Sequence, residues 1–122
     1  MADLKNYKVY KNTQFEVLTD DGFKDFKGLI VGENRNKLKL EFDKGISLVC
    51  TPKHKLMINK KDFVYAKDLT VNDRIFNGIT INNITKFESD EKVYEFLHVQ
   101  DNHQYYVNDI LSKNCLIVDE MA

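Results

Sequence analysis

Several features that mark other protein classes are missing from this sequence. It contains no apolar run of about 18 residues, the length that a membrane-spanning helix requires. It has only two cysteines, Cys50 and Cys115, and no visible signal peptide, so we expect a reduced intracellular setting rather than a disulfide framework. The net charge is −1, so neither nucleic acid nor an acidic membrane is the expected partner.

Long helices are also missing from the pattern. No extended segment repeats apolar residues with the helical period of about 3.6 residues, and proline occurs once, at Pro52. Short runs of Val, Ile, Leu, Phe and Tyr alternate instead with turns rich in Asp, Asn and Gly. A chain of 122 residues with 43% hydrophobic and 30% charged residues can form one domain with a modest core. We therefore predict a compact all-β domain of short antiparallel strands over 14–19, 37–42, 46–50, 55–58, 74–76, 79–81, 93–99 and 104–107.

One hairpin is predicted in detail. Lys37–Phe42 alternates charged and apolar side chains, which indicates a strand with one buried face and one face in water. Asp43–Gly45 is a turn signal that joins this strand to the apolar run beginning at Ile46. Residues 62–69 are expected to form a short helical turn or an irregular connection.

A T-x-x-H pattern follows the predicted strand that ends at Cys50. Thr51 and His54 at a strand end can reach one point, where His can protonate a departing amine and Thr can hydrogen-bond a carbonyl under attack. Taken alone, so short a pattern is more typical of an ordinary polar turn.

An Asn-Cys pair near the end of the sequence also carries chemistry. The Asn114 side chain can attack its own carbonyl and break the following peptide bond, and Cys115 can accept an acyl group as a thioester. His103, eleven residues before Asn114, could activate that amide or polarise the scissile carbonyl. Each of these residues alone also fits an ordinary loop, and His98 fits a half-buried strand.

A zinc site is the alternative use of these side chains. Cys50, His54, His98, His103 and Cys115 could in principle supply four ligands. Their spacings fall on predicted strands and turns rather than on a zinc knuckle or a helix, so we expect no metal and no other cofactor.

In order along the chain, these pieces resemble the C-terminal part of an intein with the Hint (Hedgehog/intein) fold, over about Asn12 to Cys115. Ala66–Ile75 is similar to the family's L-x-x-G-D segment, with Asn72 in place of the usual Gly. Asn108–Cys115 is similar to the closing block N-G-I-L-x-H-N-C. The other similar segments are the phage-type opening 12–23, the T-x-x-H block 47–54 and the penultimate block 93–103.

The resemblance implies protein splicing without a cofactor. Thr51 and His54 would promote the first acyl shift, and Cys115 would capture the acyl group. Asn114 would then cyclise to a succinimide with help from His103. These roles follow from the matched positions in the family.

Besides Asn72, two departures from the family pattern concern candidate catalytic positions. Lys113 replaces the usual penultimate His, and Lys serves acid–base chemistry near neutral pH only when its pKa is lowered. The Asp of the penultimate block matches Glu95 when counted from Val93, but Phe96 when counted back from His103. A one-residue bulge would favour Glu95.

A third departure concerns the first nucleophile. Met1–Lys11 contains no Cys or Ser. We therefore expect residues 1–114 to be the C-fragment of an atypically split intein. Its partner would be a short N-fragment that carries a Cys or Ser nucleophile and adds strands to exposed sheet edges.

The last residues resemble a different protein. Leu116–Glu120 is similar to a Walker B strand, as in the large terminase subunit of tailed phages, and residues 115–122 would be a remnant of the flanking host protein, the C-extein. The chain has no G-x-x-x-x-G-K-[ST] loop, so it is not itself an ATPase. A phage origin implies expression in the bacterial cytoplasm.

Two other functions fit parts of the pattern. A Hedgehog-type autoprocessing domain would pass an acyl group to a small nucleophile, but it does not need the Asn114-Cys115 pair. A small β-barrel binding module would carry out no chemistry at all.

Overall fold

The fold consists of short strands, as the sequence predicts. The computed structural model describes residues 5–12, 15–19, 21–59, 61–97, 99, 104–108 and 110–113. These residues form twelve strands and three 3-10 helical turns, arranged in four small antiparallel sheets. The predicted all-β class is therefore confirmed.

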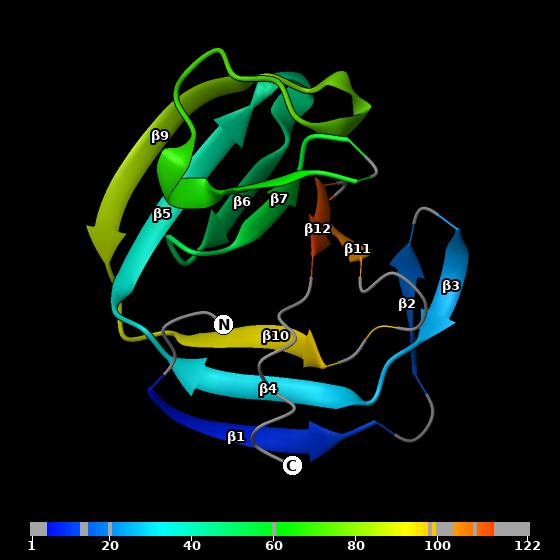
Figure 1. Ribbon diagram of the computed structural model, residues 1–122. Helices are drawn as coiled ribbons and strands as arrows, with labels where there is room; N and C mark the ends of the chain where they lie inside the picture. Colours follow the sequence, from blue (N-terminus) through cyan, green and yellow to red (C-terminus); the bar gives the residue numbers. More distant parts are fainter. Residues whose placement is uncertain are drawn as a thin grey trace.

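The first sheet forms a separate layer below the others in Figure 1, with strand order β1-β4-β10. Its strands are β1 (Lys5–Lys11), β4 (Gly28–Glu33) and β10 (Lys92–Leu97). The edge strand β1 approaches β4 very closely at Gly28. A Cβ atom added to Gly28 would lie 2.4 Å from the carbonyl oxygen of Tyr10. Glycine at this position thus allows β1 and β4 to pair.

The second sheet contains the predicted hairpin, in the order β6-β5-β9. Strands β5 (Asn36–Phe42) and β6 (Ser47–Cys50) are joined by the turn η1 (Asp43–Gly45). Lys44 and Gly45 both have positive φ there, which reverses the chain within three residues. Strand β9 (Ile81–Glu88) pairs antiparallel with the other edge of β5.

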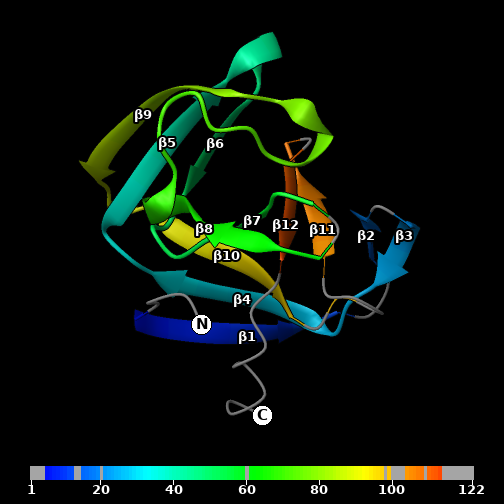
Figure 2. The same ribbon diagram turned by 45° about the horizontal axis from the view of Figure 1, so that its top comes forward.

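The third sheet has the order β11-β12-β7-β8. Its strands are β7 (Lys55–Met57), β8 (Phe63–Tyr65), β11 (Gln104–Val107) and β12 (Ile110–Lys113). A separate two-stranded sheet of β2 (Glu16–Thr19) and β3 (Gly22–Asp25) lies beside β11 and β12, as Figures 1 and 2 show.

The segment between β8 and β9 differs in part from the prediction. The turn η2 (Ala66–Asp68) lies within the predicted helical or irregular connection, but that connection begins with β8. The short strand expected over 74–76 is wrong, and of the strand expected over 79–81 only Ile81 lies in a strand, at the start of β9. Arg74 and Thr80 form only an isolated bridge around the turn η3 (Phe76–Gly78), because Asn77 and Gly78 have positive φ and close the chain too tightly for paired strands.

The main core is enclosed by the second and third sheets. Leu40, Leu56, Ile81 and Ile110 are fully buried and come from β5, β7, β9 and β12. Each fully buried Leu or Ile side chain contributes about 1.5–3 kcal/mol relative to an exposed one. This core fixes the position of the connection between β6 and β7, which contains the T-x-x-H pattern.

Candidate active site

The T-x-x-H pattern forms a tight turn between β6 and β7. The backbone N–H of His54 donates a 3.1 Å hydrogen bond to the carbonyl of Thr51, and Pro52 takes the second turn position, where its fixed φ is favourable. The turn is also attached to η2, since Lys67 N–H donates to Pro52 O at 2.8 Å and Ala66 N–H to His54 O at 2.9 Å. The Thr51 and His54 side chains therefore extend from a fixed backbone.

The His54 ring reaches across to the strand that leads to the Asn-Cys pair. Its Nε2 atom lies 2.9 Å from the Ser112 hydroxyl oxygen, a hydrogen bond between residues 58 positions apart. Ser112 is fully buried in β12, which pairs with both β7 and β11. Ser112 was not among the site residues predicted from the sequence. The only feature of the sequence that points to Ser112 is that this small polar residue directly follows the apolar pair Ile110-Leu111.

Desolvation of the half-buried His54 ring favours the uncharged imidazole. Desolvation lowers the pKa of His54 from its ordinary value of 6.5 to about 4. The ring is therefore neutral near pH 7, with one nitrogen protonated and the other free to accept a proton.

This pKa predicts a loss of stability in mild acid. Between pH 6.5 and 4 the unfolded chain protonates His54 while the native ring stays neutral, so protons favour unfolding. The free energy of unfolding should fall over that window by at most about 3 kcal/mol, at 1.36 kcal/mol per pH unit. Urea unfolding at several pH values measures the effect. The same fall in His54→Gln would contradict the assignment to His54.

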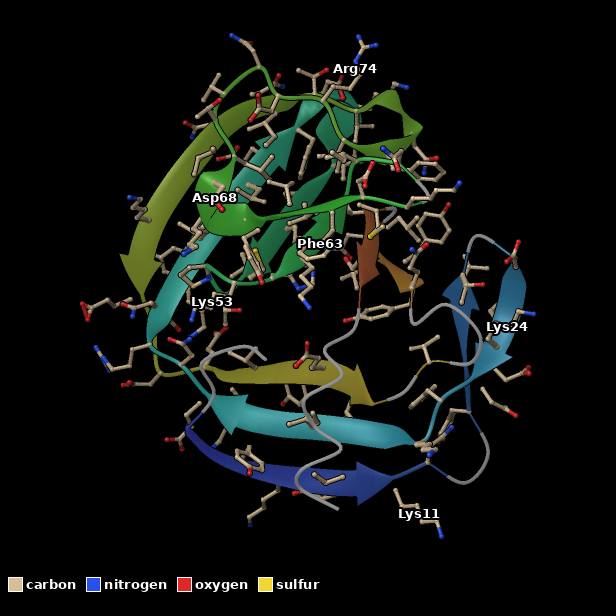
Figure 3. The ribbon with its side chains drawn as sticks, in the orientation of Figure 1. Lys11, Lys24, Lys53, Phe63, Asp68 and Arg74 are labelled. Atoms are coloured by element: carbon tan, nitrogen blue, oxygen red, sulfur yellow. The ribbon has the colours of Figure 1, made fainter. Side chains whose placement is uncertain are left out.

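Thr51, His54 and Glu95 line one cavity of about 330 Å³. The cavity lies between the turn after β6 and strands β4, β10 and β11. Lys53, which belongs to that turn, is labelled in Figure 3 between the upper strands and the lower sheet. Thr51 is buried, Glu95 is half-buried, and the Oε2 atom of Glu95 is shielded from solvent. The charged residues that line the cavity are Lys37, Glu91, Lys92 and Glu95.

The structure also bears on the two alternatives for the penultimate block. Glu95 pairs with the buried Ile30 in the β4–β10 ladder and lines the cavity. The ladder continues from Lys92 to Leu97 without a register shift, so the one-residue bulge that would favour Glu95 does not lie within β10.

Cys50 lines the same cavity but is not a reactive thiol. The side chain is buried, and desolvation raises the pKa of Cys50 to about 12. Because the thiolate is the nucleophilic form, Cys50 is inert near neutral pH.

The other predicted site residues fall at or beyond the limits of the described chain. His98, His103, Asn114 and Cys115 lie outside the described residues, as do residues 115–122. Lys113 ends β12, where its backbone is opposite Lys55 of β7. Among the described residues, no group of three His, Cys, Asp or Glu side chains could hold a metal ion. Nor does the described part of the chain contain a helix long and apolar enough to cross a membrane.

Comparison with solved structures identifies the fold. A consensus engineered intein (Cat) with an atypical split site is 28% identical, with a TM-score of 0.80, over 88% of this chain and 89% of that chain. The VidaL intein is 24% identical with a TM-score of 0.67, over 81% and 69% of the two chains. The transcription factor IIB Mvu mini-intein is 12% identical with a TM-score of 0.75, over 93% and 82%.

Sequence comparisons add no further relative, since no protein-family model and no curated protein matches the chain. The structural likeness nevertheless extends over most of the chain and over most of each of these inteins. The chain has the Hint fold of inteins, and its similarity to them supports a function in protein splicing.

Proposed function

We propose that this chain is the C-fragment of a split intein and carries out protein trans-splicing. One observation carries the proposal: on an intein fold, Thr51, His54 and Glu95 line a single cavity, and His54 is hydrogen-bonded to β12, the strand that precedes Asn114. Residues 1–114 would be the intein fragment and residues 115–122 the C-extein remnant.

The first step uses the cavity. A Cys or Ser of the N-fragment attacks the carbonyl carbon of the preceding peptide bond, and the carbon–nitrogen bond breaks to give a thioester or ester. The neutral His54 imidazole takes the proton of the nucleophile and delivers it to the departing amine. The Thr51 hydroxyl donates a hydrogen bond to the carbonyl oxygen as negative charge develops there.

The later steps use the Asn-Cys pair. The Cys115 thiolate attacks the thioester or ester and takes over the N-extein, which makes a branched chain. The Asn114 side-chain nitrogen then attacks its own carbonyl carbon, releases the amine of Cys115 and leaves a succinimide. That amine attacks the Cys115 thioester and forms a normal peptide bond. His103 assists the cyclisation, and Glu95 takes the place of the penultimate-block acid.

The partner supplies the first nucleophile. The earliest Ser or Cys in this sequence is Ser47, which lies in β6, so the nucleophile of the first step comes from another segment. Exposed apolar side chains support association with such a segment: Phe15 and Phe23, beside and within the two-stranded β2–β3 sheet, are 65% and 66% exposed. The similar Cat intein is itself described as having an atypical split site.

A ligation assay tests the proposal. The chain is mixed with the N-fragment of the engineered intein that has the atypical split site, fused to a tag protein, and products are identified by mass spectrometry. We expect the tag joined to Cys115–Ala122 and free residues 1–114. Cys115→Ala is the matched control, because it removes the acceptor thiol and should prevent ligation.

The chain alone provides a second readout. Slow loss of Cys115–Ala122 during incubation, with a succinimide on the remaining fragment, would support Asn114 chemistry without any partner. A chain that stays intact alone and gives no ligation would instead favour a binding module.

A further inference from the structure

We infer that Ser112 is a positioning residue, which fixes the protonation pattern of the His54 ring and ties that ring to the C-terminal strand. His54 Nε2 and Ser112 Oγ lie 2.9 Å apart, within hydrogen-bond distance. The consequence of this contact for splicing rests on the proposed function, but the state of the ring can be measured without it.

The surroundings of Ser112 favour one direction for this hydrogen bond. The Ser112 side chain is fully buried, and its hydroxyl also lies 3.5 Å from the carbonyl oxygen of Ile110. A carbonyl oxygen can only accept a hydrogen bond, so a hydroxyl proton directed there leaves a lone pair for His54. In this arrangement Nε2 carries the ring proton and donates it to Ser112.

The other ring nitrogen, Nδ1, is the one that faces a molecule in the cavity. Nε2 makes the only side-chain hydrogen bond of His54 among the described residues, and the ring lines the cavity. Nδ1 has no hydrogen-bond partner among the described groups, and it is not one of their solvent-shielded unpartnered atoms, so it is open to the cavity. The Nδ1 atom is thus the proton acceptor that His54 offers to a molecule in the cavity.

The same hydrogen bond connects the two reaction sites. Ser112 pairs with Leu56 of β7 and Tyr105 of β11, so its position is fixed from both sides. Asn114 follows two residues later in the sequence. The Ser112 hydroxyl therefore holds the His54 ring against β12, the strand that precedes Asn114 in the sequence.

Nuclear magnetic resonance of the chain alone tests the ring state. With ¹⁵N-labelled histidine at pH 7, His54 should show a protonated Nε2 and an unprotonated Nδ1. Ser112→Ala should populate the Nδ1-protonated form, whereas Ser112→Thr, which keeps the hydroxyl, should restore the original signals. Ser47→Ala removes an exposed serine of β6 and should change nothing. A ring protonated at Nδ1, or identical signals in Ser112→Ala, would overturn the inference.

Thiol-induced cleavage in the ligation mixture tests the functional consequence. Ser112→Ala should slow release of the N-extein about tenfold, the rate equivalent of one lost hydrogen bond, and Ser112→Thr should recover the rate. Melting curves followed by circular dichroism establish that each variant is folded. An altered ring with an unchanged rate would refute the role of Ser112 in splicing. Absence of cleavage in the unmodified chain would refute the proposed function and leave the ring assignment standing on its own measurement.

Discussion

Replacing Asn114 by Ala is expected to stop release of the C-terminal segment while leaving acyl transfer intact. No other group can supply the attacking amide nitrogen, so the cleavage rate at the 114–115 bond should fall at least about 100-fold. In the ligation mixture the branched thioester should then accumulate. Time-resolved mass spectrometry measures both species, because the branched product is heavier than either fragment and is cleaved by added thiol.

A second asparagine provides the control for this experiment. Asn82 is exposed on β9, and Asn82→Ala makes the same chemical change away from the cavity, so it should leave cleavage unchanged. Cleavage of Asn114→Ala at the original rate would show that Asn114 is not the cyclising residue. The succinimide on the released fragment should likewise be absent from the Asn114→Ala reaction.

Replacing His54 by Ala is expected to have the second large effect, at the opposite junction. A general acid–base group contributes about 10²–10⁴-fold to a rate, and His54 is the proposed proton acceptor of the cavity, with a pKa lowered to about 4. Thiol-induced release of the N-extein should therefore slow by about that factor. Cleavage at Asn114 should slow much less, since the proposed helper there is His103.

The design separates loss of chemistry from loss of structure. His54→Gln keeps a polar side chain that can still reach Ser112, yet it cannot exchange protons, so it should be nearly as slow as His54→Ala. Lys53→Ala changes an exposed neighbour in the same turn and should retain the normal rate. If His54→Gln released the N-extein at the normal rate, His54 would have no acid–base role.

Local sequence patterns predicted those parts of the fold that depend on neighbouring residues. Alternation in Lys37–Phe42 and the turn Asp43–Gly45 predicted the β5–β6 hairpin, because side-chain period and positive φ are properties of the chain itself. Strands β1 and β4 were not predicted. Pairing across the β1–β4 ladder depends on the close approach at Gly28, and single-residue propensities contain no information on such an approach.

The features of the candidate site also divide into those that depend on residue type alone and those that depend on distant residues. Residue type and order were enough to indicate which groups could react, namely Thr51, His54 and the Asn114-Cys115 pair. The contact between His54 and Ser112, the position of Glu95 at the same cavity and the raised pKa of Cys50 became visible only in the folded chain. The physical reason is that hydrogen bonding and desolvation depend on residues distant in the chain. These are brought together only when β7, β10 and β12 pack around the core.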